Sequence, residues 1–185
     1  MVFPSAYLPP VSYLRAMHSS DEVQIEVCEH YVKQTIRNRC WIASPNGPLA
    51  LTVPVEKQPK KIPMCDVRIS DHGNWRHQHW NALASSYGQS PFFEYYADEF
   101  APFYEKKWDF LVDYNEALME VLCLNIDVEL PRSRTTSFQG VDDWAGVAGP
   151  AEPYYQQFAS RNGFLADLSA VDLLFNKGPE SIFYL

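Results

Sequence analysis

The stretch VFPSAYLPPVSYLRAMHSSDEVQIEV, residues 2–27, decides the fold class. Residues 2–8 are predicted to form a strand that runs into Leu8-Pro9-Pro10, because prolines end a strand and preset φ for the first turn of a helix. Residues 11–18 are then predicted as that helix, and residues 23–27 alternate apolar with polar side chains, as a half-buried strand does. A strand, a short helix and a strand in this order open a parallel α/β unit.

The rest of the chain adds a β-hairpin and several helices to that unit. Residues 32–43 and 49–55 are β-prone, and the Asn46-Gly47 pair between them is typical of a tight turn. Periodicity predicts two further strands, over residues 66–70 and 125–129. It also predicts helices over residues 75–87, 92–103, 107–124 and 165–175. The sequence therefore predicts an α/β fold: a mixed sheet that begins with a strand-helix-strand unit, with a β-hairpin insertion and helices packed on the sheet.

Length and composition indicate a single domain. The 185 residues fall within the usual size of one domain, and 46% of them are hydrophobic, which is enough to build one core. Residues 131–151 show little periodicity and are predicted to be a flexible loop within a single domain of residues 1–185.

The cysteines and the N-terminus indicate the cellular compartment in which the protein is expected. The four cysteines contain no CxxC pair, so neither a zinc cage nor a redox motif is indicated, and free thiols are expected. The N-terminus lacks a basic region followed by a long apolar core, and no run approaches the roughly 18 apolar residues of a membrane span. A cytoplasmic protein without membrane insertion is therefore expected.

Charge is distributed unevenly along the chain. The net charge of −8 argues against a nucleic-acid binder, because phosphate neutralisation needs an extended cationic surface. Residues 30–80 nevertheless carry eight basic and three acidic side chains, a local charge of +5, while the remaining residues carry seven and twenty, or −13. We expect this basic segment to attract a small anion, whereas a long polyanion would be repelled by its surroundings.

Within the basic segment, Arg37-Asn38-Arg39 is the first candidate binding motif, with Lys33 close by in sequence. If this motif lies in a strand, Arg37 and Arg39 project to one face about 7 Å apart. Two guanidiniums side by side suit a phosphate or carboxylate group. A solvated strand face, or pairing with nearby acids, is the structural alternative.

A second candidate is Trp75-Arg76-His77-Gln78-His79-Trp80, at the predicted start of a helix. His77 and His79 point about 200° apart on a helix, so a shared metal ion is not expected. His79 is the candidate general acid or base, and Trp80 a candidate ring-stacking residue. A hydrogen-bonded structural histidine is the alternative.

The third candidate is the turn Tyr7-Leu8-Pro9-Pro10, after the first strand. In open α/β sheets, ligands favour the edge where the strands end at their carboxyl termini. Tyr7 is therefore included among the predicted substrate-binding residues.

With these residues in hand, the chain resembles the WbqC-like protein family over nearly its full length. The resemblance rests on the order of several short segments, none specific alone: Tyr7-Leu8-Pro9, Lys33-Gln34 to Arg37-Asn38-Arg39, residues 51–55, Trp75 with His79-Trp80 and Tyr87, Ser90-Pro91-Phe92-Phe93, Asn115, and Leu168-Ser169 to Asn176 with Gly178. The chain departs from the family pattern at Phe3-Pro4-Ser5-Ala6 and Pro9-Pro10-Val11-Ser12-Tyr13, and of the acidic residues usual after the second strand only Glu29 is present.

The resemblance implies a place in surface-polysaccharide (O-antigen) gene clusters and a role in modifying sugars or acyl groups. It supplies no established catalytic residues, and the cofactor is unknown. Our leading hypothesis is an enzyme-like domain, a transferase that modifies or transfers a group to an amino or nucleotide-linked sugar, with that small anionic molecule as its partner. The alternative is a non-catalytic binding or scaffold protein of a polysaccharide assembly complex. An enzyme should gather Arg37, Arg39 and His79 around one concave pocket, whereas a scaffold should spread them over a flat surface.

Overall fold

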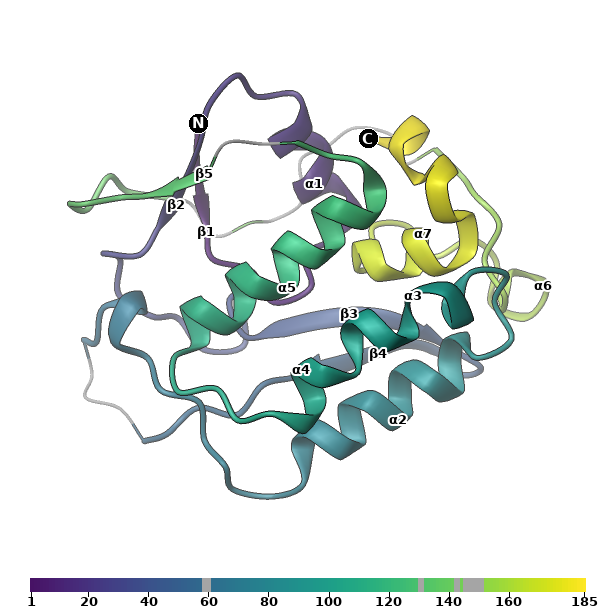
Figure 1. Cartoon of the computed structure of the whole chain (residues 1–185), viewed down its shortest axis with the longest axis horizontal. Coiled ribbons are helices and arrows are strands. Elements are labelled where there is room, and N and C mark those ends of the chain that lie inside the picture. Colours follow the sequence, from purple (N-terminus) through teal and green to yellow (C-terminus); the bar gives the residue numbers. More distant parts are fainter. Residues whose placement is uncertain (58–60, 130–131, 142–143, 145–151) are drawn as a thin grey trace.

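The computed structural model describes residues 1–57, 61–129, 132–141, 144 and 152–185. The predicted strand-helix-strand unit is present: strand β1 (Val2–Pro4), helix α1 (Val11–His18) and strand β2 (Val23–Glu26). β1 and β2 pair in parallel, and strand β5 (Arg132–Arg134) pairs in parallel with the other edge of β2. This three-stranded sheet, together with a separate hairpin and the helices, confirms the predicted mixed α/β class (Figure 1).

Strand β5 lies inside the segment that the sequence assigned to a loop. Its three residues, Arg-Ser-Arg, carry no apolar alternation, so periodicity could not reveal it. The strand expected over residues 125–129 is wrong, because the preceding helix continues to Ile126 and ends at Asp127, whose φ of 63° is left-handed. Residues 142–143 and 145–151 of the predicted loop lie outside the described residues.

The hairpin consists of strands β3 (Arg39–Ser44) and β4 (Gly47–Thr52), paired antiparallel with Ser44 opposite Gly47. Gly47 has a φ of 101°, which explains why the turn requires glycine. The first strand begins seven residues later than predicted. The preceding residues turn back on themselves, and the backbone N–H groups of Asn38 and Arg39 both donate to the carbonyl of Thr35.

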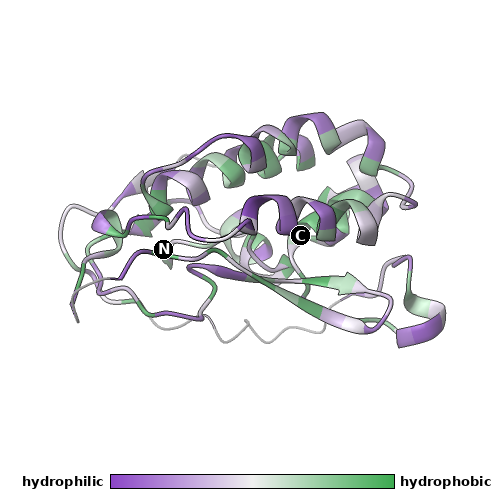
Figure 2. Cartoon of the chain, turned by 90° about the horizontal axis from the view of Figure 1, so that it is seen from below, coloured by the Kyte–Doolittle hydropathy of each residue, from purple (hydrophilic) through white to green (hydrophobic). Residues whose placement is uncertain are grey.

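The helices cover the strands. They are α2 (Trp75–Tyr87), α3 (Phe93–Phe100), α4 (Pro102–Glu105), α5 (Leu111–Ile126), α6 (Ala159–Asn162) and α7 (Ala170–Lys177), with 3₁₀ turns η1 (Met64–Asp66) and η2 (Gly178–Tyr184). α2 has the predicted bounds, whereas the strand predicted over residues 66–70 is reduced to isolated bridges at Arg68 and Ile69. Figure 2 shows most of the helical ribbons above the hairpin.

Helix α5 supplies much of the core. Its side chains Leu111, Val112, Leu118 and Leu122 are almost completely buried, as its apolar periodicity predicts. The helix packs against α3, α7, η1 and η2. Side chains of α5 also line two surface hollows, one of them together with residues of β2 and β5.

Candidate functional site

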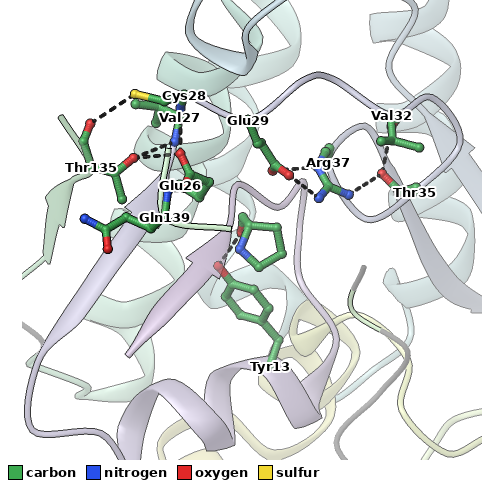
Figure 3. A network of polar contacts seen from close by, with 11 residues as sticks. Tyr13, Glu26, Val27, Cys28, Glu29, Val32, Thr35, Arg37, Thr135 and Gln139 are labelled. Atoms are coloured by element: carbon green, nitrogen blue, oxygen red, sulfur yellow. Dashed lines mark hydrogen bonds and ion pairs between the residues drawn. The ribbon is translucent and has the colours of Figure 1, made fainter. Parts of the chain in front are cut away.

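Arg37 is buried rather than presented to solvent. It lies in the turn before β3, and only 1% of its surface is exposed. Its Nε and Nη2 donate to Glu29 Oε1 and Oε2 at 2.7 and 2.6 Å, and Nη1 donates to Thr35 Oγ1 at 3.1 Å (Figure 3). The expectation that Arg37 shares a strand face with Arg39 is wrong, because the chain turns inward here to pair the guanidinium with Glu29.

Of the other predicted residues near Arg37, Asn38 is buried and Lys33 is exposed. Asn38 is 4% exposed; its Nδ2 donates to the carbonyl of Val53 and its Oδ1 accepts the backbone N–H of Gln34, so its amide holds the turn to the hairpin. Lys33 is exposed on the same turn. Only Lys33 and Arg39 among the predicted cationic residues therefore remain open to a ligand.

His79 belongs to a closed aromatic cluster. Its Nδ1 lies 2.9 Å from Tyr7 Oη, which lies 3.0 Å from Tyr104 Oη, and only 6% of the histidine is exposed. Burial lowers the pKa of His79 to about 4, against an opposing effect of its hydrogen bond to the Thr52 carbonyl. The imidazole is thus neutral and sealed from solvent, so the expectation that it meets the arginines in one cleft is wrong.

Tyr7 and Trp80 pack beside His79. Tyr7 is completely buried, and burial raises the pKa of its hydroxyl well above the usual value. Trp80 is half-buried and stacks on Tyr104, with ring centroids 5.7 Å apart. Tyr7 and Trp80 thus pack in the same aromatic cluster as His79, through Tyr104.

Arg39 takes a different position, at the start of β3 and beside the N-terminal turn. It lines a cavity of about 230 Å³ together with Leu8, Pro10, Ile36, Cys40, Trp41, Trp144, Asp167 and Ser169. Arg39 Nε donates to Thr52 Oγ1 at 2.8 Å, and no carboxylate in the described part of the chain pairs with its guanidinium. A cavity therefore lies at the turn where the sequence predicts a ligand site. It is lined by one of the two predicted arginines, Arg39, and not by Arg37.

One cation, Arg39, and one anion, Asp167, line this cavity. Asp167 is turned to the first turn of α1, where its Oδ1 and Oδ2 accept the backbone N–H and the hydroxyl of Ser12 at 2.8 Å each, and it does not pair with Arg39. Trp41 is 48% exposed on the hairpin. A guanidinium without an ionic partner thus lies beside two indoles, which is a combination suited to an anion joined to a flat or ring-shaped group.

Sequence reasoning missed several side chains that shape the molecule. Trp144 and Asp167 are far from Arg39 in sequence, and no periodic pattern links them. Glu26 was also missed: its carboxylate accepts the N–H groups of Cys28 and Gln139 and the hydroxyl of Thr135 (Figure 3). Burial opposes ionisation of Glu26, but these hydrogen bonds prevail and lower its pKa. The cluster ties β2 to the segment after β5.

No group of three or more metal-ligating side chains occurs in the part of the chain that the structure describes. Among the same residues, no helix combines the length and the apolar character needed to cross a membrane.

Fold and cavities together define an α/β domain with polar, solvent-facing hollows beside its strands. The model of the WbqC-like protein family matches residues 5–148, and the chain belongs to that family. It is 27% identical to the uncharacterized protein Rv1507c of Mycobacterium tuberculosis, in an alignment that covers 98% of this chain and 94% of the relative. No solved structure matches the chain.

Proposed function

We propose that this chain binds a nucleotide-linked sugar at the Arg39 cavity and modifies it, or transfers a group to it, during surface-polysaccharide biosynthesis. The observation that carries the proposal is the guanidinium of Arg39, which has no carboxylate partner in the described chain and lines a cavity with Trp41 and Trp144. Membership of the WbqC-like family supports the proposal through the polysaccharide context that the family resemblance implies.

Each part of the ligand has a matching side chain. A phosphate oxygen can accept charge-assisted hydrogen bonds from the Nη groups of Arg39, which have no hydrogen-bond acceptor among the described residues, and a base or sugar ring can stack on the exposed indole of Trp41. Lys33, exposed on the turn that precedes β3, adds positive charge at the same end of the hairpin. At about 230 Å³, the cavity accepts one end of such a ligand, and the remainder extends over the hairpin.

A second candidate, a non-catalytic binding or scaffold protein, is favoured by one specific observation. The histidine expected to transfer a proton is sealed against Tyr7, so it offers no acid or base to a ligand at Arg39. Both candidates require the same binding event, and they differ in whether the ligand is chemically changed.

Isothermal titration with a panel of nucleotide sugars tests the shared binding event. Arg39→Gln should weaken binding at least about tenfold, the loss expected for one charge-assisted contact, and Trp41→Ala should weaken it as well. Arg161→Gln, at an exposed site outside the cavity, is the matched control and should bind like the parent protein. If every nucleotide sugar fails to bind, or if Arg39→Gln binds normally, the proposed site is wrong.

Mass spectrometry separates the two candidates once a ligand is known. The parent protein is incubated with the bound nucleotide sugar and a set of acyl donors, and the sugar is analysed for a change in mass. A product that forms with the parent protein and is lost in Arg39→Gln supports the transferase, whereas tight binding without a product supports the scaffold.

A further inference from the structure

A second hollow lies between helix α5 and the parallel sheet, at the carboxyl end of β1 and along β5. It has a volume of about 290 Å³ and shares no lining residue with the Arg39 cavity. The side chains and backbone that surround it are those of Ser5, Ala6, Tyr13, Ile25, Asn115, Glu116, Met119, Glu120, Arg132, Ser133 and Arg134. Ligands of open α/β sheets bind at this edge, beyond the carboxyl ends of the strands. We name this hollow the α5 cleft.

Two of the charged side chains in the α5 cleft neutralise each other. Arg134 Nε and Nη2 donate to both oxygens of Glu116, at 2.6 to 3.0 Å, and Nη2 also donates to Asp113 at 2.6 Å. These three residues are therefore already paired with one another, and one arginine with two carboxylates leaves a formal charge of −1 beside the cleft.

Two further charged side chains remain open. Arg132 donates from Nη1 to the sulfur of Cys123 at 3.2 Å and has no carboxylate partner among the described residues. Glu120 is exposed and has no hydrogen-bonding or ionic partner in the same part of the chain. Both side chains also line an adjoining depression, so they flank the open mouth of the cleft. One guanidinium and one carboxylate thus face the same space without pairing to each other.

Asn115 gives an independent indication of a ligand. It is only 1% exposed and lines the α5 cleft, where its Nδ2 donates to Ser5 Oγ at 3.0 Å and to the carbonyl of Arg37 at 2.8 Å. Its Oδ1 has no hydrogen-bond donor among the described residues. A buried acceptor without a donor costs free energy, and a ligand in the cleft that brought an N–H or O–H to Asn115 would remove this cost.

We infer that the α5 cleft binds a small zwitterion that carries an ammonium and a carboxylate, the chemistry of a free amino acid. Arg132 matches the carboxylate, Glu120 matches the ammonium, and Asn115 Oδ1 accepts from a donor of the ligand. A phosphate or other simple anion would meet the carboxylate of Glu120, and a simple cation would meet the guanidinium of Arg132. The inference goes beyond the proposed function, because it concerns a different ligand at a different place.

L-serine is a suitable probe, since its hydroxyl adds a donor to the ammonium and the carboxylate. Two analogues each remove one charge: L-serinamide lacks the carboxylate, and N-acetyl-L-serine lacks the ammonium. Saturation-transfer NMR and isothermal titration should show binding of L-serine and at least about tenfold weaker binding of either analogue. If L-serine does not bind, or if one analogue binds as well as L-serine, the zwitterion assignment is overturned.

Variants locate the binding. Glu120→Gln and Arg132→Gln should each weaken L-serine binding about tenfold or more, while Glu105→Gln and Arg161→Gln, at exposed positions outside the cleft, should leave it unchanged. Circular dichroism and thermal melts confirm that each variant is folded. Arg39→Gln should leave L-serine binding intact, and Arg132→Gln should leave nucleotide-sugar binding intact, so the failure of one proposal is distinguishable from the failure of the other. Unchanged L-serine binding in both Glu120→Gln and Arg132→Gln would contradict the inference.

Discussion

Arg37 and Arg39 are separated by one residue but lie in two different environments. Arg37 is sealed beneath the hairpin and holds Glu29 with two hydrogen bonds, whereas Arg39 lines an open cavity and has a threonine hydroxyl as its side-chain partner. The same contrast separates His79, enclosed by tyrosines, from Trp41, which is half exposed. The basic segment therefore has a buried side and a side open to solvent, and between Arg37 and Arg39 the boundary falls at Asn38.

The buried ion pair should give the largest effect. Arg37→Ala leaves Glu29 charged and without its partner in the core, so the free energy of unfolding should fall by about 3–5 kcal/mol in urea denaturation. Arg39→Ala, which removes one hydrogen bond at a half-buried site, should cost only about 1 kcal/mol. The double variant Glu29→Leu with Arg37→Met should be more stable than Arg37→Ala alone, since it removes both charges. If Arg37→Ala and Arg39→Ala lowered the free energy of unfolding equally, the two arginines would not differ in their contribution to stability.

Acidic pH should give the second-largest effect, a loss of folding stability through protonation of His79. The unfolded chain protonates His79 near its ordinary pKa of 6.5, whereas the folded chain does so only near 4, so the unfolded state binds more protons between these values. Stability should therefore fall as pH decreases from 6.5 towards 4, by up to about 3 kcal/mol from this group.

Denaturant unfolding across that pH range, in the parent protein and in His79→Gln, measures this contribution as the difference between the two curves. His77→Gln, at an exposed position on the same helix, is the control and should follow the parent. A His79→Gln curve parallel to that of the parent would show that His79 is protonated as easily in the folded protein as in the unfolded chain.

Removal of the Tyr7 hydroxyl should give a smaller loss than removal of Arg37. Tyr7→Phe takes away the hydrogen-bond partner of His79 Nδ1 and Tyr104, and the free energy of unfolding should fall by about 1–3 kcal/mol. Tyr31→Phe is a matched control, because the Tyr31 hydroxyl is buried without a partner among the described residues and its loss should cost little. Thermal and urea unfolding of the two variants compare these effects, and equal losses would indicate that the Tyr7 contacts add no stability.

Local sequence signals predicted the elements whose ends carry turn chemistry. α1 and α2 have the bounds expected from Pro9-Pro10 and from Gly88, and the hairpin turns at Pro45-Asn46, directly before Gly47. Elements that depend on distant partners were missed: β5 has no apolar alternation and is held in place by pairing with β2. The fold class was therefore accessible from the sequence, while the full sheet was not.

Side-chain burial was the part of the site that the sequence could not supply. The prediction placed Arg37 in a strand, but its partner Glu29 draws the turn inward, and this pairing is a tertiary contact. The partner of His79 is Tyr7, far away in the chain, so proximity to a helix start misled the assignment. Arg39 and the N-terminal turn do meet at a cavity, although through Trp144 and Asp167, which no motif indicated.

Chemical modification of the arginines tests the contrast most directly. Native protein is treated with phenylglyoxal, with and without inorganic pyrophosphate, and modified sites are mapped by peptide mass spectrometry. We predict rapid modification of Arg39 that pyrophosphate slows, no modification of Arg37 until the protein is denatured, and modification of the exposed control Arg161 that pyrophosphate does not change. Modification of native Arg37 as fast as Arg39, or a rate at Arg39 that pyrophosphate leaves unchanged, would contradict the account.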